Sequence, residues 1–339
     1  MHTVSQGLLL LVLAGAMNGS FTLPMKYTRS WAWENTWLAW TVFALFVFPP
    51  VLTFLTLPQV RSVYAETGLH PVILVAACGA GWGISQVFFG LAVDAIGIAL
   101  SFSVILGLSA AVGSLVPLLT LHREKILSAA GLGVIAGVVL VAVGVGICAV
   151  AGRRREAATG KGPTAGAASM GRGLLYCLFS GLGSALVNFG LAYGKVLIVT
   201  AQKLGGSPTW SPNAVWMPLM IAGGVPNLVY CVYLLHKNAT TSRFSQPGTN
   251  FYWLLAAIMA FFWFGSTVIY GASSMLLGDW GPILAWPLFM SLIVITASLH
   301  GIFTGEWKEA GPRPLRIQLT GVAVLILAVA VLSRASQHV

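Results

Sequence analysis

Long apolar stretches alternate with short charged ones along the whole chain. Ten windows contain no Asp, Glu, Lys or Arg: 1–25, 35–60, 67–93, 95–122, 126–152, 173–194, 204–236, 244–278, 280–305 and 317–333. A bilayer core of roughly 30 Å takes about 20 helical residues, with a range of roughly 17–25. Every window reaches this length, so the pattern predicts ten transmembrane helices.

The stretch from Tyr270 to Lys308 predicts a helix pair built around a bend. A Gly-Asp-Trp-Gly-Pro corner at 278–282 separates two apolar runs, and the second run contains Trp286-Pro287. Proline removes a backbone donor and kinks a membrane helix, and neighbouring groups or a water-lined cavity must then satisfy the freed carbonyl. We therefore expect a bent helix beside other polar groups.

Composition excludes a soluble protein. Hydrophobic residues make up 57% of the chain and charged residues 8%, against about 25% charged residues in soluble domains. The mean hydropathy is +0.87. The formal charge of +10 belongs to loops between windows, so we expect a lipid bilayer and no nucleic acid as partner. The four cysteines lie in apolar windows without metal-ligand spacing, which is typical of small buried side chains.

The chain divides into two halves that resemble each other. A linker at 152–172, rich in Gly, Ala and Arg, separates residues 1–151 from 173–339, with five windows in each half. Several residues recur in the same order in both halves: Asn18…Lys26 and Asn188…Lys195, Trp82…Gly90 and Trp263…Gly271, Gly97…Ser114…Thr120 and Gly281…Ser298…Thr304. An odd number of spans inverts the second repeat, as in secondary transporters. The predicted fold is an all-α integral membrane protein with ten transmembrane helices arranged as two inverted five-helix repeats.

Basic residues predict the orientation. Lys and Arg divide twelve to six between the two sides, and the linker lies on the richer side. Because Lys and Arg mark the cytoplasmic face, we expect a cytoplasmic linker and both termini in the periplasm.

Polar side chains lie deep in several windows. Asn18, Gln86, Asn188 and Asn227 are far from the window edges. Amides both donate and accept hydrogen bonds, which suits a hydroxylated ligand. An amide can equally bond a neighbouring helix with no ligand present. For Asn18 and Asn188, which correspond in the two halves, we favour lining of a cavity.

Tryptophans fall into two groups. The first group stands near the window ends, where an interfacial belt accounts for it: Trp31, Trp33, Trp37, Trp40, Trp280 and Trp307. Trp82, Trp263 and Trp286 lie deeper. An aromatic face packs against the C–H side of a sugar ring, so Trp286, next to Pro287, and Tyr270 complete the predicted substrate site.

Ionisable residues are scarce inside the windows. His300 is the one histidine clearly within a window, and its ordinary pKa of about 6.5 lets it carry a proton. Glu306 and Glu34 border the spans. These three residues are the candidates for proton coupling. The sequence contains no H-E-x-x-H, G-x-S-x-G or phosphate-loop motif, so we expect no enzyme, no cofactor and no metal.

The chain resembles the bacterial L-rhamnose–proton symporter family, a ten-helix branch of the drug/metabolite transporter superfamily. The resemblance lies in three groups of motifs: Pro24-x-Lys26…Trp31-x-Trp33-Glu34…Trp37, Asn227-Leu228-x-Tyr230-Cys231, and Gly281…Trp286-Pro287…Phe289-Met290…Gly305-Glu306-Trp307-Lys308. It covers both halves. It implies uptake of a deoxy-sugar coupled to proton influx.

The sequence therefore predicts a monosaccharide–proton symporter of the bacterial inner membrane, with L-rhamnose as the expected sugar. The two repeats would alternate access to a midplane cavity lined by the six substrate residues named above. Two alternatives stay open: an exporter of metabolites or drugs with the same fold, and a non-transporting receptor or scaffold. Sodium in place of the proton also stays open, as does the oligomeric state.

Overall fold

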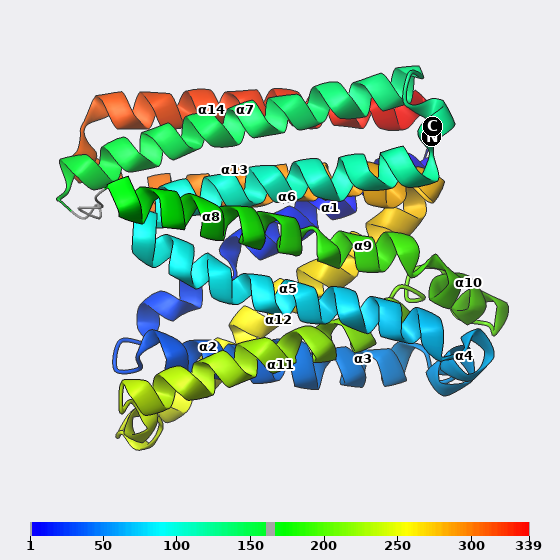
Figure 1. Cartoon of the computed structure of the whole chain (residues 1–339), viewed down its shortest axis with the longest axis horizontal. Helices are drawn as coiled ribbons and strands as arrows, with labels where there is room; N and C mark the ends of the chain where they lie inside the picture. The colour runs from blue at the N-terminus through cyan, green and yellow to red at the C-terminus, as the bar shows by residue number, and fades with distance from the viewer. Residues whose placement is uncertain (1, 161–166, 339) are drawn as a thin grey trace. The chain divides into compact units, whose positions relative to one another are not determined.

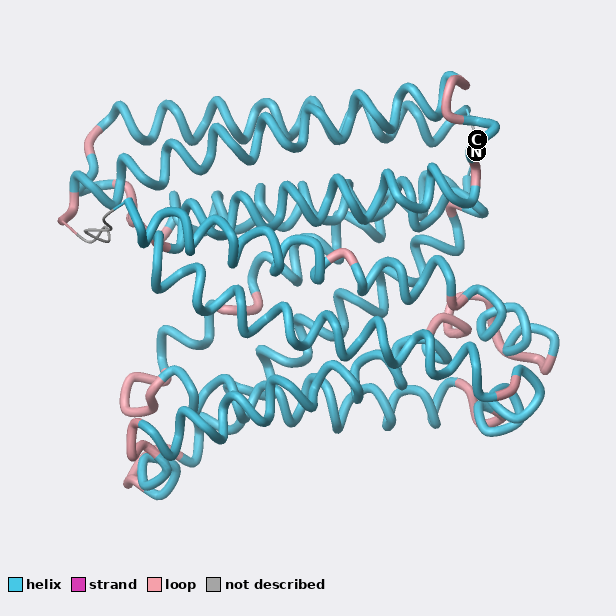
Figure 2. The backbone as a smooth tube through the Cα atoms, in the orientation of Figure 1, coloured by secondary structure: helices cyan, strands magenta, loops and turns pink. Residues whose placement is uncertain are grey.

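The computed structural model describes residues 2–160 and 167–338, and within these ranges the chain is helical with no strand (Figure 2). Ten helical spans of the described residues are long and apolar enough to cross a membrane: Thr3–Tyr27, Trp33–Thr56, Leu69–Ile96, Leu100–Leu121, Ala129–Ala158, Met170–Lys203, Asn213–Lys237, Asn250–Leu276, Gly278–Phe303 and Pro312–Ala335. Each span falls mainly on one predicted window, in the same order. The prediction of ten transmembrane helices is confirmed.

The helices form two compact units. Unit 1 holds the segment that ends at Gly19, residues 85–188 and the chain from Ser273 onward. Its helices are α1 (His2–Ser20), the second half of α5 (Leu69–Ile96), α6 (Ile98–Leu121), α7 (Ala129–Ala158), α8 (Ala167–Ser184), α13 (Gly281–Phe303) and α14 (Pro312–Ala335), with the short helices η3 (Arg123–Lys125), η5 (Gly278–Trp280), η6 (Lys308–Ala310) and η7 (Ser336–His338).

Unit 2 holds residues 20–84 and 189–272. Its helices are α2 (Trp33–Thr41), the π-helix η2 (Val42–Val47), α3 (Phe48–Thr56), α4 (Val60–Thr67), the first half of α5, most of α9 (Leu186–Tyr193), α10 (Lys195–Lys203), α11 (Asn213–Lys237) and most of α12 (Asn250–Leu276), with η1 (Leu23–Tyr27) and η4 (Thr241–Ser245).

The units do not follow the two sequence halves, because each unit takes segments from both. The breaks fall after Gly19 and Ile84 in the first half, and after Asn188 and Ala272 in the second. Each half therefore contributes its segments in the same order, as expected of a repeat. The repeat boundaries and the inversion of the second copy stay predictions.

The predicted linker is partly helical. Helix α7 continues to Ala158 and α8 begins at Ala167, while residues 161–166 lie outside the described range. Alanine, arginine and glutamate are strong helix formers, and they dominate residues 151–158. The low hydropathy of this stretch marked the end of a membrane window and not the end of the helix.

Small residues bring helices close together within unit 1. Helices α7 and α14 lie side by side over most of their length (Figure 1). A Cβ added at Gly133 would lie 2.7 Å from Cβ of Ala335, and one at Gly137 would overlap Leu332. Gly133-x-x-x-Gly137 is therefore a close-packing motif between α7 and α14.

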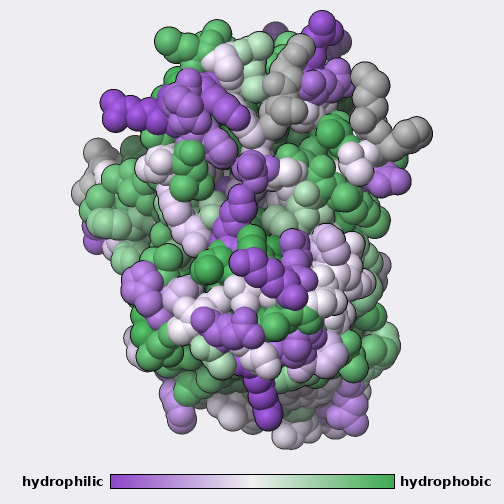
Figure 3. Space-filling view, turned by 90° about the vertical axis from the view of Figure 1, so that its right-hand side faces the viewer, coloured by the Kyte–Doolittle hydropathy of each residue, from purple (hydrophilic) through white to green (hydrophobic). Residues whose placement is uncertain are grey.

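Helix α1 begins and α14 ends at the same end of unit 1 (Figure 1), as an even number of spans requires. Hydrophilic side chains gather on the face that this end presents, with hydrophobic ones along the margins (Figure 3). The ordering of polar and apolar surface is that of a membrane protein with its charged groups in the connections.

In unit 2, a proline inside α11 is compensated by a tyrosine. Pro218 has no N–H, so the carbonyl of Ala214, four residues earlier, lacks its helical donor. The Tyr64 hydroxyl of α4 donates to this carbonyl over 2.9 Å. Burial raises the pKa of the Tyr64 hydroxyl, so the group keeps the proton that it donates.

The interfacial-belt prediction fails for four of the six tryptophans. Trp31, Trp40, Trp280 and Trp307 are between 2% and 7% exposed, whereas belt residues contact lipid headgroups. Their rings pack inside the protein. Sequence position near a window end therefore did not show which way the rings turn.

Candidate functional site

A polar junction forms in unit 1 around Asn188. This fully buried residue lies on α9, and its Nδ2 donates to the carbonyls of Gly113 on α6 (2.7 Å) and Pro282 on α13 (2.9 Å). The Gly113 carbonyl needs a donor from elsewhere because Pro117, four residues later, has no N–H. Asn188 thus supplies the donor that α6 lacks at Gly113 and holds α6 to the first turn of α13.

The second proline-bearing helix of unit 1, α13, is completed in the same way. Pro287 in α13 leaves the carbonyl of Ile283 without its helical donor. The buried hydroxyl of Ser114, on α6, donates to that carbonyl. The two proline-bearing helices α6 and α13 therefore exchange polar contacts at the carbonyls that their prolines leave without a helical donor.

Trp286 reaches the same turn of α6. Its ring is 4% exposed, and its Nε1 donates to the carbonyl of Ser109 over 2.9 Å. The indole lies directly on Gly113, where any added Cβ would overlap it. The structure thus brings together two of the predicted substrate residues, Asn188 and Trp286. We call Ser109, Gly113, Ser114, Asn188 and Trp286 the α6–α13 junction.

Asn18 and Gln86 also belong to unit 1. Asn18 is 8% exposed near the end of α1, next to Gly19, where an added Cβ would lie 2.6 Å from Cβ of Thr296 on α13. Gln86 is half-buried on α5, with a long hydrogen bond of 3.5 Å from its Nε2 to the Ser85 hydroxyl. Asn18 thus stands on a helix that packs against α13. The contacts of Gln86 do not connect it to the α6–α13 junction.

Asn227 and Tyr270 belong to unit 2. The Nδ2 of Asn227 donates to the carbonyl of Gly223 in its own helix, over 3.0 Å. Tyr270 is fully buried, with its ring 6.2 Å from that of Trp216. The Asn227 contact is a local bond within α11, and the role of both residues in substrate binding stays a prediction.

His300 and Glu306 stand together at the far end of α13. The Thr304 hydroxyl donates to the carbonyl of His300 (2.8 Å) and to Oε1 of Glu306 (3.4 Å). Glu306 also forms an ion pair of 2.9 Å with Arg155 at the end of α7, and the Arg155 guanidinium lies 5.1 Å from the ring centre of Trp307. In the sequence Arg155 is one of several linker charges, and no pattern indicates its ion pair with Glu306.

Glu34, the third proton-coupling candidate, lies in unit 2. Its carboxylate is 5% exposed and accepts hydrogen bonds from Asn238 Nδ2 (3.0 Å) and the Thr240 hydroxyl (2.6 Å). These bonds tie the connection after α11 to the first turn of α2. The negative charge also suits the N-terminal end of a helix, so Glu34 has a structural role in this conformation.

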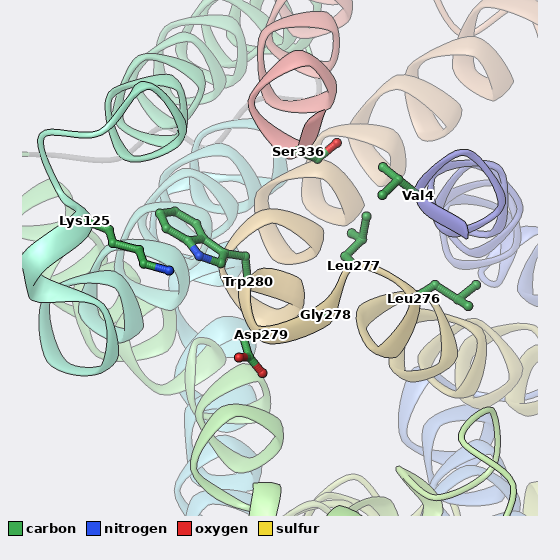
Figure 4. A pocket seen from close by; sticks show the side chains of 8 residues that line it. All are labelled: Val4, Lys125, Leu276, Leu277, Gly278, Asp279, Trp280 and Ser336. Atoms are coloured by element: carbon green, nitrogen blue, oxygen red, sulfur yellow. The ribbon is translucent and has the colours of Figure 1, made fainter. Parts of the chain in front are cut away.

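A separate cavity of about 350 Å³ opens beside the corner between α12 and α13 (Figure 4). Lys125, Asp279 and Trp280 supply most of its polar lining, and the Lys125 side chain extends toward the indole (Figure 4). None of the predicted substrate residues lines it.

Across the described residues, no cluster of His, Cys, Asp and Glu is arranged to hold a metal ion.

Comparison with known proteins assigns the family. The profile of the family described as L-rhamnose-proton symport protein (RhaT) matches residues 1–336. The chain belongs to this family. It is 26% identical over 336 residues to the L-rhamnose-proton symporter of Citrobacter koseri, and 26% identical over 334 residues to that of Salmonella gallinarum, with 96% of each chain covered in both comparisons.

Membership of the L-rhamnose-proton symport family confirms the resemblance inferred from the sequence motifs. The family consists of transporters, so the chain is a multi-pass membrane transporter and not an enzyme. The matched range contains the α6–α13 junction and the Arg155–Glu306 pair.

Proposed function

We propose that the protein imports L-rhamnose together with a proton across the bacterial inner membrane by alternating access. The observation that carries the proposal is the family match over essentially the whole chain. The relatives from Citrobacter koseri and Salmonella gallinarum bear the name L-rhamnose-proton symporter. The linker at 152–172 is on the cytoplasmic side in this proposal, and both termini are in the periplasm.

The α6–α13 junction has the chemistry that such a sugar requires. It combines an amide, hydroxyl groups and an indole ring inside a transmembrane region. Hydroxyl groups of a sugar both donate and accept hydrogen bonds, as an amide does. We propose Asn188 and Trp286 as substrate contacts here, with Asn18 on the neighbouring helix. Gln86, and Asn227 and Tyr270 of unit 2, are further proposed substrate contacts.

Proton influx supplies enough energy for accumulation. One charge crossing 100 mV yields about 2.3 kcal/mol. Since about 1.4 kcal/mol corresponds to a tenfold ratio, one proton per sugar supports accumulation of more than tenfold. The proposed proton-carrying groups are His300, Glu306 and Glu34. His300 lies in the last turn of α13, and Glu306 follows shortly after this helix ends.

Uptake into proteoliposomes tests this proposal. We expect purified protein to accumulate labelled L-rhamnose when the outside is acidic, in sodium-free buffer, and to lose the accumulated sugar when a protonophore is added. L-mannose is the control sugar because it differs from L-rhamnose only in carrying a hydroxyl group at C6. The assay is repeated in buffer that contains sodium. Uptake only in the presence of sodium would make sodium the coupling ion in place of the proton. Absence of rhamnose uptake in both buffers would exclude rhamnose as the substrate.

A further inference from the structure

Five tryptophans form a continuous series of ring contacts inside unit 2. Trp33 and Trp37 stack with ring centres 5.1 Å apart, and the Trp37 and Trp40 centres are 4.6 Å apart. Trp40 meets Trp263 edge-on at 5.1 Å, and Trp263 stacks on Trp82 at 5.4 Å with an interplanar angle of 19°. We call these five residues the indole ladder.

The spacing of residues on α2 produces the first part of the ladder. Trp33, Trp37 and Trp40 are four and three residues apart, so they lie on one face of the helix. Exposure falls along this face, from 39% at Trp33 through the half-buried Trp37 to 2% at Trp40. The ladder therefore leads from the surface at the start of α2 into the interior of unit 2.

The buried end of the ladder carries polar atoms that lack partners. Among the described residues, Trp40 Nε1 and the adjacent Thr41 hydroxyl are buried and have no hydrogen-bond partner. Trp40 is 2% exposed and Thr41 is fully buried. Such groups are uncommon in native proteins, because leaving a buried donor unsatisfied costs about 1–3 kcal/mol. A hydroxylated ligand at this end would supply the missing acceptor and donor.

The backbone changes form at the same place. The π-helix η2 begins at Val42, directly after these two residues. Pro49 and Pro50 have no N–H, and the Phe48 N–H bonds the carbonyl of Phe43, five residues earlier. π-Helical turns are rare and occur frequently at functional sites. Ring contacts, unpartnered polar atoms and an unusual backbone thus coincide at the end of α2.

We propose that the indole ladder binds the transported pyranose by stacking on its C–H face, with Trp40 Nε1 donating to a sugar hydroxyl. This inference rests on the proposed sugar transport. A pyranose ring has one face rich in C–H groups, and L-rhamnose adds an apolar methyl group, which matches the large apolar surface of an indole. The lipid-belt alternative does not account for Trp40, which is 2% exposed.

Three variants at Trp37 and Trp253 test the ladder. Trp37→Leu removes the central aromatic ring, whereas Trp37→Phe retains an aromatic face. Trp253→Leu is the control: Trp253 is 38% exposed, close to the 39% of the ladder residue Trp33, and its ring contacts are with Trp31, Phe43 and Phe244 outside the ladder. Because an aromatic contact contributes about 0.5–1.5 kcal/mol beyond area burial, Trp37→Leu should raise the KM for rhamnose by up to about tenfold. Trp37→Phe should raise KM by less than Trp37→Leu, because it keeps part of the aromatic face, and Trp253→Leu should leave KM nearly unchanged.

Equal KM values for Trp37→Leu, Trp37→Phe and the wild type would overturn the ladder as a sugar site, as would an equal rise in Trp253→Leu. If Trp37→Leu does not fold, Trp33→Leu replaces it against the same control. Wild-type protein that transports no rhamnose contradicts the proposed function instead. In that case the ladder is tested by the rise in melting temperature that each of a panel of pyranoses produces. A sugar that raises the melting temperature of the wild type more than that of Trp37→Leu supports a sugar site at the ladder. If no pyranose does so, the proposed site is wrong.

Discussion

Replacing Asn188 with alanine is expected to lower both the stability of the protein and its uptake of rhamnose. The substitution removes the donor to the Gly113 carbonyl, and Pro117 offers no helical N–H in its place. A buried carbonyl without a partner costs about 1–3 kcal/mol. Thermal unfolding in detergent should show a lower melting temperature, and proteoliposomes should take up less rhamnose.

A second substitution separates the structural role of Asn188 from a role in binding. Pro117→Ala restores a backbone N–H that reaches the Gly113 carbonyl, so the stability cost of Asn188→Ala should be smaller in that background. If Asn188 also contacts the sugar, rhamnose affinity stays low in the double variant while stability recovers. Recovery of both together would show that Asn188 is a packing residue only, and an undiminished stability cost would contradict the proline explanation.

Replacing Glu306 with glutamine is expected to abolish proton-driven accumulation while exchange of rhamnose across the membrane continues. Glutamine keeps the shape and hydrogen-bonding oxygen of the side chain but cannot bind and release a proton. Helix α13 connects this end of unit 1 to Trp286 and Pro282 in the α6–α13 junction. The variant should equilibrate labelled rhamnose by counterflow without concentrating it.

Arg155→Gln is the matched control for this prediction. It breaks the same 2.9 Å ion pair but leaves a carboxylate at Glu306 that still titrates. Accumulation should therefore persist in Arg155→Gln. Loss of accumulation in both variants would assign the Arg155–Glu306 pair a structural role. Accumulation retained in Glu306→Gln would exclude Glu306 as the proton carrier. His300 and Glu34 would then be tested as glutamine variants.

The arrangement of spans was accessible from the sequence because hydropathy reports directly on which segments leave water. All ten windows overlap helices, and the corner at 278–282 is the short helix η5 followed by α13 with Pro282 in its first turn. The breaks within spans were not predicted. The sixth span is divided into α8, α9 and α10 near Ala185 and Gly194, and these breaks do not alter the mean hydropathy of the window.

The site was only partly accessible for a different reason. A proline such as Pro117 shows that the carbonyl four residues earlier loses its donor, yet the sequence does not show which side chain replaces it. That Asn188 serves Gly113, and Ser114 serves Ile283, depends on tertiary packing. The depth of an amide in a window could not distinguish a structural bond from a ligand contact. Trp40 likewise was assigned to a lipid belt, because position along a helix does not give the direction of its ring.

The most direct test of proton-coupled rhamnose uptake is to measure the proton movement that the sugar itself causes. Proteoliposomes with no initial pH gradient are placed in weakly buffered, sodium-free medium, and the external pH is recorded as L-rhamnose is added. Proton symport predicts a rise in external pH that depends on rhamnose and disappears when a protonophore is added. Rhamnose uptake into the same vesicles without any change in external pH would contradict proton symport.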